Sequence, residues 1–197
     1  MVEHLPWIGE HYANGIKNQR VAIVGHSHPS EKGEQDLNDY TNQIVKQFIE
    51  GQNIKFFSII QRYFGFENRS EFWNRVLFIN YISDWVPSRY HPGTGEQIDR
   101  AKQRFQKLLS TERPDKIFVF TSKGWSILPP TREECDHSGL RPISVEISEF
   151  SPFRWGTYVA GDHTAMAFGL RHPQGANTKL MQRVVRHIMT MPLVGER

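Results

Sequence analysis

The sequence contains a single cysteine, Cys135, among 197 residues. This excludes an intrachain disulfide framework and an iron–sulfur cluster held by this chain's own thiolates, which needs about four cysteine ligands. No stretch approaches the roughly 18 apolar residues of a membrane span, and the first residues lack the basic-then-apolar pattern of a signal peptide. We therefore expect a cytoplasmic protein in a reducing compartment, with no membrane partner.

Neither sign of charge dominates the chain, which has 24 Lys and Arg residues against 21 Asp and Glu. Its halves differ, because residues 1–98 carry 9 basic and 11 acidic residues whereas residues 99–197 carry 15 and 10. Residues 163–195 contain no carboxylate side chain but include Arg171, Lys179, Arg183 and Arg186. A local basic surface of this kind suits a polyanionic partner, although on charge alone a solvated helix surface explains it equally well.

Length and composition predict one globular domain over residues 1–197. Short apolar runs alternate with helical patterns along the chain. Strands are expected at 20–25, 76–79, 116–120 and 166–170, and helices at 34–50, 96–110 and 177–190. A long loop is expected at 129–142 and an edge strand at 143–147. The alternation predicts an α/β fold with a parallel-centred sheet and helices on both faces.

In such sheets the functional site lies outside the carboxyl ends of the strands. That rule selects three segments, at residues 25–30, 80–84 and 171–177. Each follows an apolar strand, and together they are dense in His, Asn and Pro. We therefore predict that the functional site is assembled from these three segments.

The first segment contains the pair His26-Ser27-His28. Two histidines in this spacing after a strand can ligate zinc, but no cysteine or carboxylate motif clearly completes the site. The barrel fold usually associated with such pairs needs about 250 residues. A structural role for these histidines within the loop is therefore favoured over a metal site.

The other two segments contain Asn80 and His172. The Asn80 amide can donate and accept hydrogen bonds at once, as a nucleobase edge requires, or it can hold a turn. The His172 imidazole can donate a hydrogen bond where negative charge develops on a leaving group, or form part of a rigid loop with Pro173.

Four motifs in chain order resemble those of the uracil-DNA glycosylase superfamily, over roughly residues 18–190. They are Val21–Gly25 with its His/Ser/Pro loop, Phe78-Ile79-Asn80-Tyr81, Ile117–Phe120 with Gly124-Trp125, and Leu170-Arg171-His172-Pro173. The resemblance implies a three-layer α/β/α fold around a mainly parallel four-stranded sheet. It also implies a monofunctional DNA glycosylase that flips a base out of DNA and hydrolyses its N-glycosidic bond without a metal or other cofactor. The single cysteine excludes the iron–sulfur branches of the superfamily.

The resemblance assigns roles to individual residues. Gly25–Pro29 would hold the hydrolytic water and line the base pocket, Asn80 would recognise the base edge, and His172 would stabilise the departing base as an anion. The loop 174–179, including Gln174 and Asn177, would press into the minor groove. Beside these roles we expect phosphate contacts from Arg171, Lys179 and Arg183, and stacking on the base by Tyr40 or Tyr81.

Three positions depart from the pattern of the best-known branch. Ser27 stands in place of an aspartate, Pro29 in place of a bulky aromatic residue that excludes C5-substituted pyrimidines, and Gln174 in place of a serine. The role of the missing carboxylate falls to His26 or His28, or to a nearby acidic side chain. The acidic candidates are Glu31, Glu34, Asp36 and Asp39.

We therefore expect a monomeric glycosylase that removes a C5-modified pyrimidine, such as the hydroxymethylated or glycosylated cytosine of phage DNA, in antiviral defence. Repair of uracil or another deaminated base is the alternative within the same chemistry. Two alternatives come from other classes: a zinc-dependent hydrolase using His26 and His28, and a non-catalytic nucleic-acid-binding module.

Overall fold

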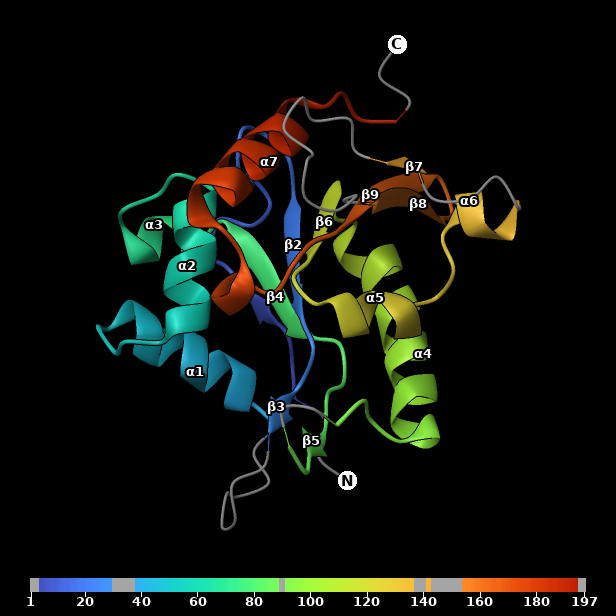
Figure 1. Cartoon of the computed structure of the whole chain (residues 1–197), viewed down its shortest axis with the longest axis horizontal. Coiled ribbons are helices and arrows are strands. Elements are labelled where there is room, and N and C mark those ends of the chain that lie inside the picture. The colour runs from blue at the N-terminus through green and yellow to red at the C-terminus, as the bar shows by residue number, and fades with distance from the viewer. Residues whose placement is uncertain (1–3, 30–37, 89–90, 137–140, 143–153, 195–197) are drawn as a thin grey trace.

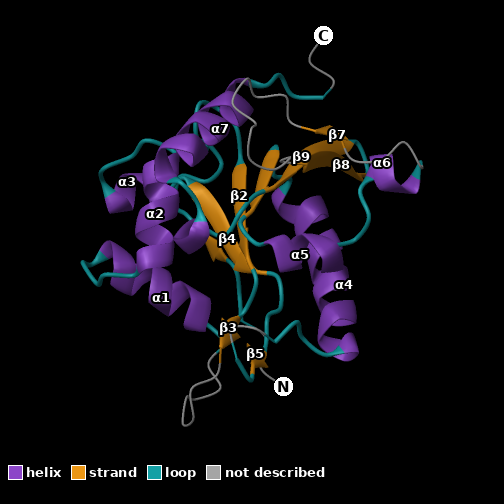
Figure 2. Ribbon diagram, viewed as in Figure 1, coloured by secondary structure: helices purple, strands orange, loops and turns teal. Residues whose placement is uncertain are grey.

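The computed structural model describes residues 4–29, 38–88, 91–136, 141–142 and 154–194. In this part of the chain one sheet has seven strands in the order β1-β4-β2-β6-β9-β8-β7, and β3 pairs separately with β5 (Figures 1 and 2). The strands are β1 (Trp7–Ile8), β2 (Val21–Gly25), β3 (His28–Pro29), β4 (Val76–Asn80), β5 (Trp85–Val86), β6 (Lys116–Val119), β7 (Arg141–Pro142), β8 (Arg154–Ala160) and β9 (His163–Gly169).

The centre of the large sheet is parallel and its edges are antiparallel. Strands β4, β2, β6 and β9 run parallel to one another, while β1 pairs antiparallel with β4 and β8 pairs antiparallel with β9. The expected four-stranded sheet therefore corresponds only to the parallel centre, and the prediction of four strands is wrong. The hairpin between β8 and β9 turns at Gly161 and Asp162, where Gly161 has a φ of 63°. A Gly-Asp pair between two strands is a hairpin signal, so the sequence did contain evidence for the added strand β8.

Helices cover both faces of this sheet (Figure 2). Helices α1, α2, α3 and α7 pack on one face, and α4 packs on the other. The helices are α1 (Tyr40–Ile49), α2 (Lys55–Tyr63), α3 (Arg69–Trp73), α4 (Gly95–Glu112), α5 (Ser122–Ile127), α6 (Arg132–Cys135), the 3₁₀ turn η1 (Pro173–Gly175) and α7 (Thr178–Thr190). The described elements thus form the α/β class and the arrangement of helices on both faces that the sequence predicts.

Successive residues of the central strands face opposite helical layers. In β2, Val21 and Ile23 pack towards α1, α2 and α7, whereas Ala22 and Val24 pack towards α4. All five residues of β2 are buried. A strand covered on both faces needs apolar side chains throughout, which explains its uninterrupted hydrophobic run. Truncation of such a side chain, as in Ile23→Ala, should destabilise the fold by about 2–5 kcal/mol.

The expected strands correspond to β2, β4, β6 and β9, and the three expected helices to α1, α4 and α7. Thr94 caps α4 in a capping box with Gln97, as its position predicts. The sequence reading missed α2, α3 and α5, and the short helix α6 lies within the stretch expected to be a loop. The expected edge strand at 143–147 lies outside the described residues. Within the described part of the chain, no helix has both the length and the apolar character needed to cross a membrane.

Candidate functional site

A cavity of about 540 Å³ opens at the carboxyl ends of the parallel strands. Residues from all three predicted segments line it, together with residues of the helical layer. The lining residues are Gly25, His26, Ser27, His28, Ile44, Ile54, Phe56, Phe57, Phe78, Asn80, Thr121, His172 and Gln174. The three segments therefore meet at the carboxyl ends of the strands, as the sequence predicts. We take this cavity as the candidate site.

Backbone hydrogen bonds fix the relative positions of the first two segments. Gly25 pairs with Asn80 in the parallel register of β2 and β4. The pairing continues past the strand ends, where the N–H of Tyr81 donates to the Gly25 carbonyl at 3.0 Å and that of Ile82 donates to the His26 carbonyl at 2.9 Å. The His26 and Asn80 side chains are thus presented from one hydrogen-bonded platform.

Arg104 of α4 supports this platform from the opposite layer. Its guanidinium donates to the main-chain carbonyls of Asn80, Tyr81 (3.1 Å) and His4 (2.8 Å). Charge-assisted bonds to carbonyls are stronger than neutral ones, so the backbone beyond β4 is held firmly. The position of Asn80 therefore depends on α4 as well as on the sheet.

Asn80 lies on the floor of the cavity with only 7% of its surface exposed. Its side-chain oxygen occupies the space above the Cα of Gly25, where any Cβ would overlap it. Residue 25 must therefore be glycine for the amide to adopt this position. The amide forms no hydrogen bond to any residue in the described part of the chain, so both its donor and its acceptor remain available to a ligand.

The orientation of His26 leaves one ring nitrogen without a partner. Its Nε2 lies 3.0 Å from the carbonyl oxygen of His91 and must donate, because a carbonyl only accepts. In the neutral ring Nδ1 is then the acceptor, and this buried atom has no hydrogen-bond partner among the described residues. Because Nδ1 is buried, a water molecule or another proton donor can reach it only if the His26 ring or its loop moves.

His28 lies in a cluster of aromatic rings. Its Nε2 is hydrogen-bonded to Thr41 Oγ1 at 3.1 Å, and its ring packs edge-on against Tyr40 and His4 at centroid distances of 4.8 Å and 5.2 Å. Burial lowers the pKa of His28 to about 3, with a smaller contribution from the neighbouring His4. The His28 ring is therefore neutral near pH 7 and cannot act as a cationic group.

His172 also lines the cavity and is exposed to solvent. The main-chain N–H of Gln174 donates to its Nδ1 at 3.3 Å, so the neutral ring carries its proton on Nε2. Partial desolvation lowers the pKa of His172 below 6.5, which keeps the ring neutral at pH 7. The loop is held by Tyr63, whose hydroxyl donates to the Pro173 carbonyl at 3.2 Å. His172 is thus a neutral N–H donor on a supported loop.

Three phenylalanines form an apolar wall that sequence reasoning missed. Phe56 and Phe57 come from the start of α2, and their rings lie 6.0 Å and 5.1 Å from that of Phe78. The Phe56 ring also lies 5.6 Å from the His172 ring. Apolar residues recur in α2 at positions 56, 57, 60 and 63, a helical periodicity that could have identified this element. Thr121, the cap of α5, was also missed and lines the cavity.

Two predicted base-binding residues, Tyr81 and Tyr40, do not line the cavity. Tyr81 is fully buried on the α4 side, where its hydroxyl donates to the Ile127 carbonyl at 2.9 Å. Tyr40 packs between Trp85 and the two histidines at positions 4 and 28 and does not line the cavity. Pro29 belongs to β3, and its side chain is outside the described part of the structure.

The predicted DNA-contacting residues lie in α7 or in the segment that leads into it. Gln174 lines the cavity, and Asn177 caps α7 by accepting the N–H of Leu180 at 3.1 Å. Lys179 and Arg183 are exposed and lie four residues apart, so they share one face of the helix. Arg171 is also exposed, two residues before η1. These cations lie on elements beside the cavity but do not line it.

The described lining residues include no carboxylate. Asp39 is exposed and accepts a hydrogen bond from Gln43 at 2.9 Å, while Glu31, Glu34 and Asp36 fall outside the described residues. No group of three His, Cys, Asp or Glu side chains in the described chain is arranged to hold a metal ion. In both His26 and His28, Nε2 is already hydrogen-bonded. The chemistry available from the described residues is therefore that of imidazoles, an amide and hydroxyls.

No protein-family model matches the chain, and no curated protein sequence matches it. The functional argument therefore rests on the geometry of the cavity. An apolar wall, a free amide and two neutral imidazoles suit a flat ligand with a polar edge that can accept a hydrogen bond.

Proposed function

We propose that the cavity binds a nucleobase flipped out of DNA and that the protein is a monofunctional DNA glycosylase. The observation that carries this proposal is the meeting of the unpartnered Asn80 amide and the His172 imidazole in one aromatic-walled cavity. The resemblance of the strand-end motifs to the uracil-DNA glycosylase superfamily supports the same reading. Flipping a base costs a few kcal/mol, and contacts in such a cavity would offset it.

In this proposal Asn80 recognises the edge of the base. Its amide can donate to a carbonyl of a pyrimidine and accept from the adjacent ring N–H or exocyclic amine. The flat faces of the base lie along the wall of Phe56, Phe57 and Phe78, since stacking of a base on an aromatic side chain contributes about 1–3 kcal/mol.

His172 stabilises the leaving base. When the bond between the sugar C1′ and the base nitrogen breaks, the base takes the bonding electron pair and negative charge develops on its carbonyl oxygen. The Nε2–H of a neutral His172 donates a hydrogen bond to that oxygen without needing to be charged. Removal of one such donor typically slows a reaction by about 10²–10³-fold.

His26 orients the attacking water. The oxygen of water forms the new bond to C1′, and one water proton must be accepted as that bond forms. The unpartnered Nδ1 of His26 is the candidate acceptor, and because this atom is buried, the first segment must move to expose it to the water. The Nε2–H of the ring is held by the His91 carbonyl. This division follows the pattern of an imidazole oriented through one nitrogen and reactive through the other.

The size of the cavity favours a bulky substrate base. Its volume of about 540 Å³ lies within the roughly 300–1,000 Å³ range of sites for larger organic ligands, which exceeds the needs of one pyrimidine ring. Together with Pro29 in place of an aromatic residue, this favours a C5-modified pyrimidine. Hydroxymethylated or glycosylated cytosine of phage DNA is such a base, and its removal would serve antiviral defence.

Uracil or another deaminated base is the second candidate. The Asn80 amide, with a free donor and acceptor, suits the uracil edge as well as that of a modified cytosine. The substrate class therefore depends on what occupies the rest of the cavity.

The test is incubation of the protein with matched DNAs that contain uracil, hydroxymethylcytosine, glycosylated hydroxymethylcytosine or unmodified bases, followed by a count of abasic sites. We expect abasic sites in modified DNA and none in unmodified DNA. Stoichiometric zinc that is lost on His26→Ala would favour the hydrolase alternative instead. Tight DNA binding with no abasic sites would favour a binding module.

A further inference from the structure

A second cavity, of about 310 Å³, lies near the amino ends of strands β2 and β4. Ile16 and Lys17 precede β2 and Arg75 precedes β4, whereas the first cavity follows both strands. Because β2 has five residues, the two cavities are separated by about 16 Å of strand. The second cavity is therefore distinct from the proposed base-binding site.

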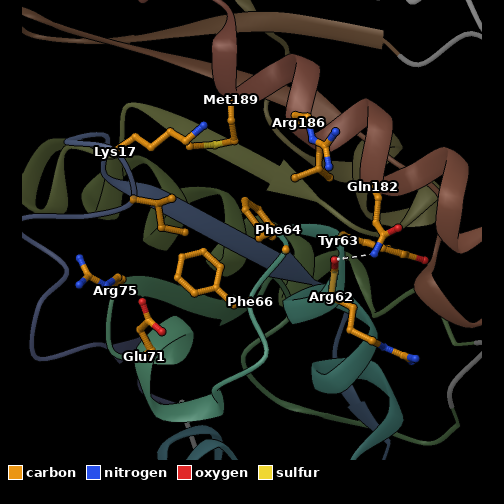
Figure 3. Close-up of a pocket in the computed structure, with 13 residues that line it drawn as sticks. Lys17, Arg62, Tyr63, Phe64, Phe66, Glu71, Arg75, Gln182, Arg186 and Met189 are labelled. Atoms are coloured by element: carbon orange, nitrogen blue, oxygen red, sulfur yellow. Dashed lines mark hydrogen bonds between the residues drawn. The ribbon is translucent and has the colours of Figure 1, made fainter.

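Four cationic residues from different elements line this cavity, and in Figure 3 the side chain of Arg62 leads away from the rings. Lys17 belongs to the turn before β2, Arg62 to the end of α2, Arg75 to the segment before β4 and Arg186 to α7. None of the four forms an ion pair with any residue that the structure describes. Glu71 is the only carboxylate among the described lining residues. The cavity thus has a surplus of uncompensated positive charge.

The floor between these cations is aromatic. Figure 3 shows the rings of Phe64 and Phe66 between Lys17 and Arg62, with Met189 above them. Both phenylalanines are only partly buried. Their rings are held from behind by Phe72, at centroid distances of 5.1 Å and 5.4 Å. A flat ring bound here would stack on a supported aromatic surface.

Lys17 occupies a backbone conformation that disfavours lysine. Lys17 and Asn18 have φ values of 54° and 59°, and they form the tip of a tight turn closed by hydrogen bonds between Ile16 and Gln19. Glycine and asparagine adopt left-handed backbone more readily than lysine does. A strained residue at a cavity rim is typical of a functional position, where the side chain is needed despite its backbone cost.

We propose that this second cavity binds a nucleotide, with the heterocycle stacked on Phe66 and the phosphate between the basic side chains. A phosphate group complements the surplus positive charge, and a base complements the aromatic floor. A free mononucleotide and a nucleotide within a single strand share this chemistry. The site does not depend on the glycosylase activity of the first cavity.

The experiment is a calorimetric titration of the full chain with deoxycytidine 5′-monophosphate and, separately, with a short oligothymidylate. Arg186→Glu reverses an exposed charge and Phe66→Leu removes the stacking ring while keeping an apolar side chain. Each should weaken binding by about tenfold or more. Glu71→Gln should strengthen it, because the only described carboxylate is removed. Lys107→Glu, on the exposed face of α4, is the matched control and should leave the affinity unchanged.

Lys17→Gly separates binding from folding. The glycine relieves the left-handed strain, so the melting temperature should rise while nucleotide affinity falls. Binding of the mononucleotide identifies a small-molecule site, and binding of the oligonucleotide alone identifies a strand-binding site. In either case Arg186→Glu and Phe66→Leu must weaken the binding. Binding of neither probe, or an equal loss in Lys107→Glu, overturns the proposal. His172→Ala should slow base release by about 10²–10³-fold without changing this affinity, so the two proposals fail independently.

Discussion

The side-chain oxygen of Asn80 fills the space above the Cα of Gly25 on the neighbouring strand. This position of the Asn80 amide therefore requires a residue without a side chain at position 25. Glycine at the end of β2 allows the amide of β4 to lie across it, and the amide then faces the cavity. In the proposed reaction this contact positions the group that recognises the base.

Gly25→Ala should therefore impair base recognition more than folding. The new methyl group would meet the movable end of the Asn80 side chain rather than backbone, so the amide would rotate away while the strands stay paired. We expect the melting temperature to fall modestly and base release to fall by about tenfold or more, as expected for a lost pair of base-edge hydrogen bonds. Thermal denaturation and single-turnover base release measure the two effects. A variant with unimpaired release would contradict the role of Asn80.

His172→Ala should slow base release by about 10²–10³-fold. His172→Gln should retain part of the activity, because its amide also supplies an N–H donor. Since desolvation lowers the pKa of His172 from its ordinary value, the neutral ring predominates at pH 7, and the wild-type rate should not fall as the pH rises from 7 to 8. A pH–rate profile of the wild type and both variants tests this. A loss of rate in that window that disappears in His172→Gln would show that the cationic ring is required.

Tyr63→Phe should affect catalysis through the His172 loop. The variant loses the hydrogen bond to the Pro173 carbonyl, which should cost about 0.5–1.5 kcal/mol of stability and lower kcat a few-fold with little change in KM. Tyr158→Phe is the matched control, because the Tyr158 hydroxyl also donates to a proline carbonyl, that of Pro129 at 2.8 Å. An equal effect of both variants on kcat would contradict the proposed role of Tyr63 in positioning the His172 loop.

The stability of the fold should depend on His28 at acid pH. The pKa of His28 is about 3 in the folded protein and about 6.5 in the unfolded chain, so between these values only the unfolded state binds the proton. The free energy of unfolding should therefore decrease as the pH falls from 6.5 towards 3, by up to about 1.4 kcal/mol per pH unit from this group. Urea denaturation from pH 4 to 7 should show a shallower slope for His28→Gln. His187→Gln, at an exposed position on α7, is the control and should keep the wild-type slope. If His28→Gln also keeps the wild-type slope, His28 is not buried as described.

The sequence predicted the strand ends well because each central strand is an apolar run that ends at a polar residue. It was less informative about side-chain direction. Neighbouring residues leaving a strand point to opposite faces, so Asn80 and Tyr81 cannot both face one cavity, and Tyr81 packs against α4 instead. That alternation could have been applied to the sequence.

Helix α2 was missed for a different reason. Its N-cap is Ile54, which has no side chain able to accept a hydrogen bond from the first turn, so the usual start signal is absent. Only packing against the sheet places Phe56 beside His172 and Phe57 beside Phe78. The aromatic wall of the cavity is a tertiary feature, and its partners are distant in sequence.

The measurement that tests the account most directly is mass spectrometry of the small molecules released from DNA containing hydroxymethylated or glycosylated cytosine. The account predicts that the wild-type protein releases the free modified base and leaves an abasic site, with no nucleotide or nucleoside released. It also predicts that Asn80→Ala and His172→Ala release the base far more slowly at unchanged fold. If the wild type releases no base from these DNAs or from uracil-containing DNA, or if both variants release it at the wild-type rate, the proposed function of this cavity is wrong.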